Sequence, residues 1–372
     1  MHILQRRIDV FIIGGGPAGL AAAIAARRRG LSVTVADGGE PPIDKACGEG
    51  LMPETVAALK DLDVEVPTQA GYRLQGLRFV QGESQVSANF PEGQGVGIRR
   101  TVLHELLIRH AERCGVKMLW RTPVAGIDGD GVLLGRDTIR ARWIVGADGG
   151  QSRARRWSKL NLALSESHRF ANRRHYHLRP WSDFAEVHWG SNVQAYVTPV
   201  GREEVCVVAM GATVDAADFQ RVLEVLPELR ERLAGAELCS RERGAVAAMQ
   251  ALARVWRGNV ALVGDASGGV DAITGEGLRL AFRQAHALAK AMQHGDLREY
   301  GWVHRRLARR PLWMGRLMLQ WGRHDWMRSR TLKMLSQHPG LFARLLAIHL
   351  GRASTGDVVS TGAQLGWRFL AS

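Results

Sequence analysis

Three glycines near the start of the chain have a spacing suited to binding a pyrophosphate. Gly14, Gly16 and Gly19 give the pattern G-x-G-x-x-G, with Pro17 and Ala18 inside it. The first glycine of such a pattern allows a sharp turn, the second lets a phosphate approach the backbone, and the third lets a helix pack closely on a strand. The N-terminus of that helix offers unpaired N–H groups to the phosphates. The pattern predicts a dinucleotide site, and a tight turn of another α/β protein is the alternative.

The elements around these glycines are those that a dinucleotide site needs. An apolar run over 8–13 predicts a buried parallel strand, and the alanine-rich stretch 18–29 predicts a helix. A second strand, 32–36, ends in Asp37, about 20 residues beyond the glycines, where a carboxylate can bind a ribose hydroxyl. No basic residue follows Asp37 directly, which favours the unphosphorylated adenosine of FAD or NAD over that of NADP.

A second stretch of small residues follows the strand predicted over 143–145. It reads Gly146-Ala147-Asp148-Gly149-Gly150. Small residues let the backbone crowd a ligand. Asp148 can also simply cap the helix that follows.

A third stretch combines a strand, an acid and a helix start. The strand predicted over 260–263 leads to Asp265, and Gly275 and Gly277 precede a helix that begins near Leu278. The N-terminus of that helix would stabilise negative charge on a ligand. We therefore expect it to point into the same crevice as the first glycine loop.

The loop 45–53 has two residues that could contact a ligand. Lys45 is either a phosphate or ribose contact or a solvated loop lysine. Cys47, next to Gly48, is either a reactive thiol or an inert small apolar residue. A short helix is expected over 54–59, because Pro53 can open it.

A region with strand periodicity separates the second and third stretches. Alternation over 185–189, 193–200 and 205–210 predicts antiparallel strands, and 72–80 with 84–90 predicts a hairpin outside the main sheet. Its aromatic residues could wall a pocket, and a helix over 219–233 should break near Pro227. The aromatic residues are Tyr176, Trp181, Trp189 and Tyr196. The histidines of this region are His175, His177 and His188, and we expect them to have structural roles.

Composition limits the class of protein and its location. A chain of 372 residues suggests two or three domains, and four cysteines without C-x-x-C spacing fit a reducing compartment. Residues 1–7 are too short and too polar for a signal peptide, and no apolar run approaches the roughly 18 residues of a membrane span. We therefore expect a cytoplasmic protein.

The net charge of +14 is concentrated near the C-terminus. Residues 298–352 hold twelve Lys or Arg and two acids, and four tryptophans lie among the arginines. Their spacing predicts amphipathic helices with a basic face, which could lie on an anionic bilayer at the inner membrane face. The alternatives are a cap with tryptophans in its core or a solvated basic face. Nucleic-acid binding is not expected, because no nucleic-acid motif is present.

The three stretches together resemble one family over about residues 8–290. They are similar to FAD-dependent oxidoreductases related to p-hydroxybenzoate hydroxylase, and within them to the geranylgeranyl reductase and flavin-halogenase branch. The resemblance implies that the first loop binds the ADP part of FAD, that Asp265 holds the ribityl chain, and that 275–278 lies beneath the isoalloxazine ring. The loop 45–50 resembles the reductase version of the loop beside the flavin, and Arg100 resembles the arginine that opens a long helix. The expected cofactor-binding residues are Gly14, Gly16, Pro17, Ala18, Gly19, Asp37, Lys45, Cys47, Gly48, Arg100, Val124, Asp148, Asp265, Gly275, Gly277 and Leu278.

Departures from the family pattern favour its reductase branch. The segment after Asp265 lacks the His and the later Pro usual in hydroxylases, although the reductases often have Pro where Ala272 stands, and the Trp-x-Trp-x-Ile-Pro signature of halogenases is absent. A second G-x-G-x-x-G for a nicotinamide domain is also absent. NAD(P)H would therefore be a transient electron donor, with a ferredoxin or quinone partner as the alternative.

The sequence thus predicts an α/β fold with three parts. They are an FAD-binding Rossmann-like (ββα) domain (1–71, 96–158 and 254–295), an antiparallel-sheet substrate domain (72–95 and 159–253) and a helical basic segment (296–372). The predicted function is reduction or dehydrogenation of a hydrophobic, isoprenoid or polyketide-like substrate by hydride transfer at flavin N5. The alternatives are a flavin monooxygenase of an aromatic or lipid substrate and a non-catalytic protein that binds membrane surfaces. The sequence nominates no catalytic side chain and no metal site.

Overall fold

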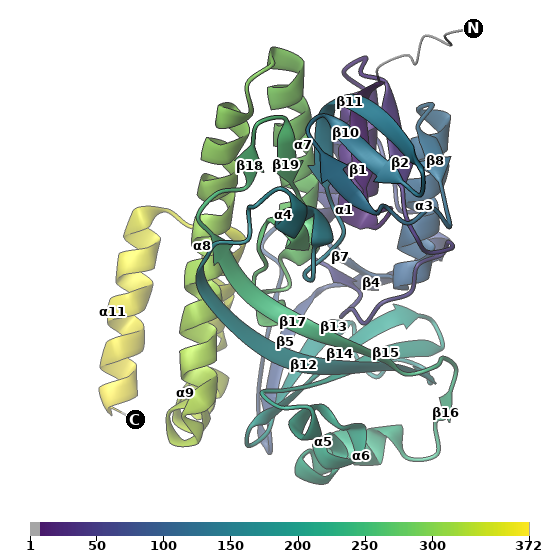
Figure 1. Cartoon of the computed structure of the whole chain (residues 1–372). Coiled ribbons are helices and arrows are strands. Elements are labelled where there is room, and N and C mark those ends of the chain that lie inside the picture. The colour runs from purple at the N-terminus through teal and green to yellow at the C-terminus, as the bar shows by residue number, and fades with distance from the viewer. Residues whose placement is uncertain (1–7, 372) are drawn as a thin grey trace, which may run out of the picture.

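Two large sheets with their covering helices, a small third sheet and a row of C-terminal helices make up the structure, a computed structural model that describes residues 8–371 (Figure 1). Residues 1–7, where no signal peptide was expected, lie outside the described residues. The first sheet has eight strands in the order β18-β19-β11-β1-β2-β8, with β10 paired to β11 and β9 to β10. Its central pairings are parallel. The bounds are β1 Ile8–Ile13, β2 Val33–Ala36, β8 Lys117–Leu119, β9 Gly126–Asp128, β10 Gly131–Leu134, β11 Asp137–Gly146, β18 Trp256–Arg257 and β19 Val260–Leu262.

Both faces of this sheet are covered, which explains the continuous apolar run of β1. Val10 and Ile12 pack under three helices on one face, whereas Phe11 and Ile13 pack against a short helix and the β9–β10 hairpin on the other. A strand buried on both faces needs no alternation of polar residues. The helices are α1 Pro17–Arg27, α3 Arg100–Arg113 and α7 Gly277–His294 on the first face and α4 Arg153–Trp157 on the second.

The second sheet also has eight strands, in the order β16-β12-β15-β14-β13-β5-β6, with β17 paired to β12. All its pairings are antiparallel except β13 with β5. Two helices cover one face, and the predicted break at Pro227 separates them. The bounds are β5 Gly76–Gln81, β6 Ser84–Asn89, β12 Ala163–His177, β13 Phe184–Trp189, β14 Val193–Gly201, β15 Glu204–Gly211, β16 Glu237–Leu238, β17 Arg243–Leu252, α5 Phe219–Val225 and α6 Pro227–Leu233.

The sequence predicts a single strand over 72–80 and another over 131–139, and each of these strands is divided in the structure. The stretch 72–80 forms β4 Tyr72–Leu74 and then β5, because the chain leaves a small third sheet and enters the second one at Gly76, where a Cβ would lie 1.9 Å from the Ala88 carbonyl oxygen. The stretch 131–139 divides at Gly135, whose φ of +59° turns β10 back into β11. The small sheet also contains β3 Gly50–Leu51 and β7 Gly95–Gly97, and α2 Pro53–Lys60 follows β3.

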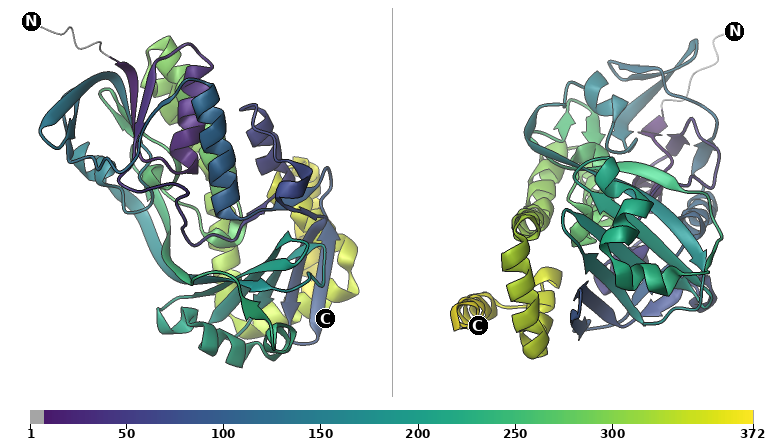
Figure 2. Two further views of the ribbon diagram at one scale, coloured as in Figure 1. Left: turned by 90° about the vertical axis from the view of Figure 1, so that its right-hand side faces the viewer. Right: turned by 90° about the horizontal axis from the view of Figure 1, so that it is seen from below.

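Four helices form the C-terminal segment, and Figure 2 shows them from two further sides. They are α8 Leu297–Arg323, α9 Asp325–Gln337, α10 Pro339–Leu350 and α11 Thr355–Ala371. The sequence left open whether the tryptophans of this segment lie in a core or on its surface, and the structure shows some in each place. Trp321 packs against Trp189 and Phe79 of the second sheet, whereas Trp302, Trp313 and Trp326 are exposed. None of the described helices combines the length and the apolar character that crossing a bilayer requires.

Candidate active site

A cavity of about 1250 Å³ lies between the two sheets and extends to the C-terminal helices. All three glycine-and-acid stretches line it. Among the residues predicted to bind the cofactor, those that line it are Gly14, Gly16, Pro17, Ala18, Asp37, Lys45, Cys47, Gly48, Arg100, Val124, Asp148, Asp265, Gly275, Gly277 and Leu278. Gly19 does not; a Cβ there would lie 1.9 Å from the Gly14 carbonyl oxygen, so Gly19 lets α1 pack on the turn.

The first loop is held by a carboxylate and by a histidine that sequence reasoning missed. Asp37 accepts hydrogen bonds from Gly15 N and Gly39 N, both at 2.7 Å. His104, fully buried on α3, accepts from Ile43 N at Nδ1, so its Nε2–H donates to the Gly15 carbonyl oxygen at 2.7 Å. Burial lowers the pKa of His104, which keeps the imidazole neutral. Its position on the apolar side of a predicted helix was the available signal.

The second loop is tied to the third by an arginine. Asp148 accepts hydrogen bonds from Arg153 N and Ala154 N and so caps α4. This confirms the prediction that Asp148 can cap the helix that follows it. Arg155 donates to Gly150 O at 2.7 Å in the second loop, and also to Gln250 Oε1 at 2.6 Å. It also reaches Ala266 O in the third loop at 3.5 Å. The loops therefore hold fixed positions around the cavity.

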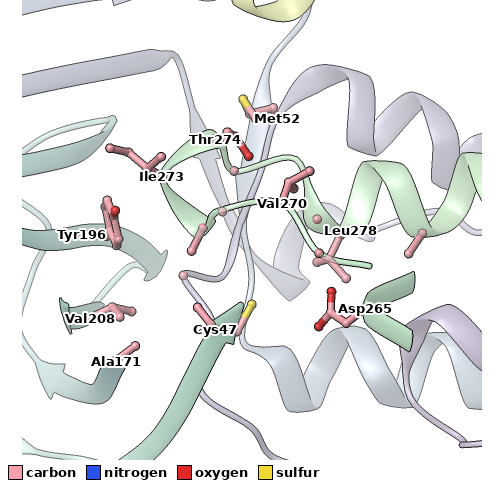
Figure 3. A pocket seen from close by; sticks show the side chains of 18 of the residues that line it. Cys47, Met52, Ala171, Tyr196, Val208, Asp265, Val270, Ile273, Thr274 and Leu278 are labelled. Atoms are coloured by element: carbon pink, nitrogen blue, oxygen red, sulfur yellow. The ribbon is translucent and has the colours of Figure 1, made fainter. Parts of the chain in front are cut away.

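The third loop presents its acid and its helix start to the cavity (Figure 3). Gly264 adopts a φ of +62°, and its N–H donates to Gln284 Oε1 at 2.8 Å. Asp265 follows it with an exposed side chain directed into the cavity. Gly275, also with a φ of +62°, precedes the first turn of α7, whose N–H groups are the donors expected near a negatively charged ring.

The residues present fit FAD. A Cβ placed on Gly16, Gly48 or Gly277 would meet no atom within 4 Å, so glycine at these positions leaves cavity space free. The Nε of Arg100 is buried and has no hydrogen-bond partner among the described residues, and Arg100 lines the cavity. A buried donor without a partner is rare and suits an anionic or carbonyl group of a ligand. Lys45 Nζ lies 3.8 Å from the Cβ position of Gly149, close to the second loop.

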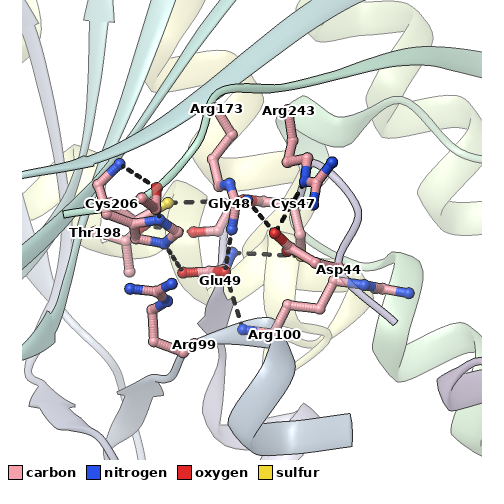
Figure 4. A network of polar contacts seen from close by, with 12 residues as sticks. Asp44, Cys47, Gly48, Glu49, Arg99, Arg100, Arg173, Thr198, Cys206 and Arg243 are labelled. Atoms are coloured by element: carbon pink, nitrogen blue, oxygen red, sulfur yellow. Dashed lines mark hydrogen bonds and ion pairs between the residues drawn. The ribbon is translucent and has the colours of Figure 1, made fainter. Parts of the chain in front are cut away.

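A buried network around Glu49 fixes the loop 47–50 (Figure 4). Glu49 accepts from Arg100 N at 2.9 Å and Arg173 Nη1 at 3.2 Å through one oxygen, and contacts His175 Nε2 at 2.6 Å through the other. The second sheet also holds the neighbouring carbonyls, because Thr198 Oγ1 donates to Gly48 O at 2.7 Å. The sequence predicted a structural role for His175, and no local pattern marked Glu49 or Arg173 as part of the site.

The oxygen, nitrogen and sulfur atoms of Glu49, His175 and Cys206 lie within 4.8 Å of one another, a spacing that a metal ion could use. However, Arg173 and the Arg100 N–H already neutralise and satisfy the Glu49 carboxylate. Burial, together with Glu49, raises the pKa of the Cys206 thiol well above its usual range, so it is not a thiolate. The cluster is therefore explained as a scaffold for the loop beside the cofactor.

The opposite side of the cavity combines apolar residues with the phenol of Tyr196. Ala171, Val208 and Tyr196 face the cavity from the second sheet, across from Asp265 and Leu278 (Figure 3). The Tyr196 hydroxyl donates to Gln194 Oε1 at 2.8 Å, which also accepts from Arg169 Nη2 at 2.6 Å. Arg169 in turn pairs with Asp271 at 3.0 Å. Burial raises the pKa of Tyr196 to about 12, although Arg169 opposes the shift, so the phenol stays protonated at neutral pH.

Beyond Tyr196 the cavity continues between the C-terminal helices. Its walls there are side chains of α8 to α11, with His349 at the boundary, where Nε2 lies 2.9 Å from the Thr274 carbonyl oxygen. The apolar residues of this part are Trp313, Met314, Leu317, Met318, Trp321, Leu335, Phe342, Leu345, Leu346, Val358, Leu365 and Phe369.

A parallel sheet with three such loops around one cavity, faced by an antiparallel sheet, defines a flavoprotein of the Rossmann-like kind. The chain belongs to the FAD binding domain family, whose profile matches residues 7–295. It is an FAD-dependent oxidoreductase.

Named relatives support this class. A menaquinone reductase of Mycolicibacterium smegmatis is 27% identical over 328 residues, which cover 80% of this chain and 79% of the relative. Digeranylgeranylglycerophospholipid reductase 1 of Methanothermobacter thermautotrophicus is 31% identical over 179 residues, 44% of each chain. A geranylgeranyl bacteriochlorophyll reductase-like structure from Thermoplasma acidophilum has a TM-score of 0.73 at 18% identity, covering 98% of both chains, and shows the shared fold.

Proposed function

We propose that this protein reduces a carbon–carbon double bond in a polyprenyl lipid or a similarly long isoprenoid. The observation that carries the proposal is one continuous cavity, which joins the cofactor loops to an apolar space walled by the C-terminal helices. The relatives named for menaquinone and for digeranylgeranylglycerophospholipid reduction support the same substrate class. Bound FAD, once reduced by an electron donor such as NAD(P)H, would supply the hydride.

The residues of this chain would position the cofactor and provide the proton. The three loops and Arg100 hold FAD, and the first turn of α7 favours negative charge on its ring. The apolar walls exclude water and align the chain of the substrate. The Tyr196 hydroxyl, which donates to Gln194 Oε1 in this structure, would give its proton to the substrate carbon that does not receive the hydride. Arg169 lies close enough to stabilise the phenolate that is left.

The test begins with the spectrum of the purified protein, followed by anaerobic reduction with NADH and with NADPH. The reduced protein is mixed with a menaquinone or a geranylgeranyl lipid, and the product is analysed by mass spectrometry. The prenyl tail is expected to gain two hydrogens, and fragmentation of the product distinguishes this from reduction of a quinone ring to the quinol. A gain of one oxygen atom in air would favour the monooxygenase alternative, and a folded protein without bound flavin would contradict both.

A positive spectrum without reduction by either nicotinamide would direct the search to a ferredoxin or quinone partner. NAD(P)H as a transient donor is the simpler arrangement, because one cavity could receive the donor and the substrate in turn. Stopped-flow measurement of flavin bleaching by each donor separates these cases.

A further inference from the structure

We propose that the outer face of the C-terminal helices docks on an anionic lipid bilayer and that the polyprenyl substrate enters the cavity from that face. The docking face comprises the exposed residues of α8 from Trp302 to Arg323 and the exposed apolar residues of α9 and α11. The entry of substrate rests on the proposed function, whereas the docking does not. The location that follows is peripheral, on the cytoplasmic side of a membrane.

The cavity opens to the surface within this face. Trp313 and Leu317 of α8 line the cavity and are 55% and 51% exposed, and Val358 of α11 lines it and is 40% exposed. Figures 1 and 2 show α11 beside α8 and α9 at the edge of the molecule. An apolar chain can therefore reach the cavity between α8 and α11 without passing through either sheet.

Exposed tryptophans are confined to this face. Of the eleven tryptophans in the chain, those with exposed side chains in the described part are Trp302, Trp313, Trp326 and Trp367, which all lie on α8, α9 and α11. A large aromatic side chain with a polar N–H is suited to the boundary between water and acyl chains. A bilayer that covers these four side chains would remove their apolar surface from water.

Basic residues alternate with these tryptophans along α8. Trp302, Arg306, Arg309, Trp313 and Arg316 recur every three or four residues, which places them on one side of the helix, and all five are exposed. The Arg306 guanidinium lies 5.7 Å from the Trp302 ring. No acidic residue occurs between Trp302 and Arg323.

Several of these arginines lack a counter-ion within the protein. Arg305, Arg309 and Arg323 have no carboxylate partner among residues 8–371, whereas Arg310 of the same helix pairs with the buried Glu276. The segment 298–352 carries a net charge of +10. An anionic lipid surface supplies the missing negative charge.

A bilayer explains the face better than a second copy of the chain or a nucleic acid. A two-fold interface would bring the arginine row of α8 against the same row of its partner, which repels. A nucleic acid would satisfy the charge but would leave the apolar mouth and the exposed valines of α11 in water. A bilayer satisfies both the charge and the apolar residues.

The experiment measures co-sedimentation of the full-length protein with vesicles of phosphatidylcholine alone or mixed with phosphatidylglycerol, over a range of salt concentrations. We expect binding to the anionic vesicles only, weakening as salt rises. The triple variant Arg305→Gln, Arg306→Gln, Arg309→Gln should bind on the order of 100-fold more weakly, because each arginine near an anionic surface contributes about fivefold.

A matched control removes the same charge elsewhere. Arg221→Gln, Arg230→Gln, Arg232→Gln changes exposed residues of α5 and α6, which cover the second sheet, and should bind vesicles much as the wild type does. Trp302→Ser should reduce fluorescence quenching by brominated lipids, whereas Leu238→Ser, an exposed apolar residue on β16, should not.

Equal weakening by both triple variants, or equal binding to neutral vesicles, would overturn the proposal. So would tighter binding to an RNA oligonucleotide than to the vesicles, or a stable dimer that Trp302→Ser dissociates. Vesicle binding needs no turnover, so an inactive protein that still binds through α8 would refute the proposed function alone. An active protein that ignores vesicles would refute the docking alone.

Discussion

Glu49 has a left-handed backbone conformation, with a φ of +57°, although it is not glycine. Such a conformation costs on the order of 1–3 kcal/mol and persists where neighbouring groups hold it in place. Here the neighbours are Arg100 N, Arg173 and His175, which come from a helix and from a strand of the other sheet. The network therefore positions Cys47 and Gly48, which line the cofactor side of the cavity.

Glu49→Gln should lower the free energy of unfolding by about 3 kcal/mol, because it leaves the buried Arg173 guanidinium with less compensation. The variant should also retain less FAD after purification, since the loop beside the cofactor loses its support. Denaturant unfolding and the ratio of flavin to protein absorbance measure the two effects. Glu242→Gln, which removes a half-exposed partner of Arg174, should change stability by at most about 1 kcal/mol.

Tyr196→Phe tests the proton source. Product formation should slow by about 100-fold or more, as expected for loss of a general acid, while reduction of bound FAD by its donor keeps the wild-type rate. Single-turnover kinetics separate the two half-reactions. Tyr72→Phe, at a phenol bonded to Asp183 outside the cavity, should leave both rates unchanged. Slowing of both half-reactions in Tyr196→Phe would instead point to a structural role.

At the level of elements, the glycines of the first loop have two separate tasks. A Cβ on Gly16 would point into open cavity space, whereas a Cβ on Gly19 would clash with the Gly14 carbonyl oxygen at 1.9 Å. One glycine therefore leaves room for the ligand, and the other lets α1 pack on β1.

Two substitutions should separate these tasks. Gly16→Val should give a folded protein without FAD, because the added side chain occupies the cofactor space. It should melt near the temperature of the wild-type protein from which FAD has been removed. Gly19→Val should melt at a much lower temperature or fail to fold. Circular dichroism melts and flavin absorbance measure both, and a Gly16→Val protein that retains stoichiometric FAD would contradict the assignment.

The sequence was informative where local pattern determines structure. The strand–glycine–helix unit, the break at Pro227 and the strands β13, β14 and β15 all follow from periodicity and turn residues, and the structure confirms them. The division at Gly76 could not be anticipated, because it depends on a backbone approach from β6. The division at Gly135 had a local signal, since this left-handed glycine is followed by Arg136 and Asp137, which are polar residues typical of a turn.

At the scale of the molecule, α8 joins the two halves of the site. Near its start Tyr300 donates to Leu262 O at 2.6 Å and His304 reaches Ser267 Oγ at 2.9 Å, both at the third loop. Near its end Trp321 packs on Trp189 of the second sheet, with ring centroids 4.8 Å apart. The resemblance to flavoproteins ends at about residue 290, before this helix, so the sequence did not predict that α8 belongs to the site.

The Glu49 network could not be predicted either, because its members lie far apart in the sequence. Glu49 and His175 are 126 residues apart, and no local pattern links a loop glutamate to a strand histidine. Only the relative placement of the two sheets makes them partners. By contrast, the convergence of the three loops could be predicted, because the ends of neighbouring parallel strands share one edge of a sheet.

Acid should destabilise the whole fold through His304. Burial, with a smaller contribution from Arg305, lowers the pKa of His304 to about 4. Between pH 6.5 and about 4 the imidazole is therefore neutral in the folded protein but protonated in the unfolded chain. The free energy of unfolding should therefore fall by up to about 1.4 kcal/mol per pH unit between pH 6.5 and about 4.

Urea unfolding at several pH values measures this slope. His304→Gln should be less stable at pH 7 but should show a shallower slope, whereas His177→Gln, at an exposed position, should keep the slope of the wild type. Identical slopes for the wild type and His304→Gln would exclude His304 as the cause.

The opening of the cavity between α8 and α11 has a consequence for the range of substrate lengths that the enzyme accepts. A blind-ended pocket acts as a ruler and rejects molecules that are too long, but a channel open at its far end sets no upper limit. Selection must then occur at the end nearest the cofactor, where the head of the molecule and the first double bonds lie. Homologous tails of increasing length should thus be turned over with similar kcat/KM, with the surplus isoprene units left trailing outside.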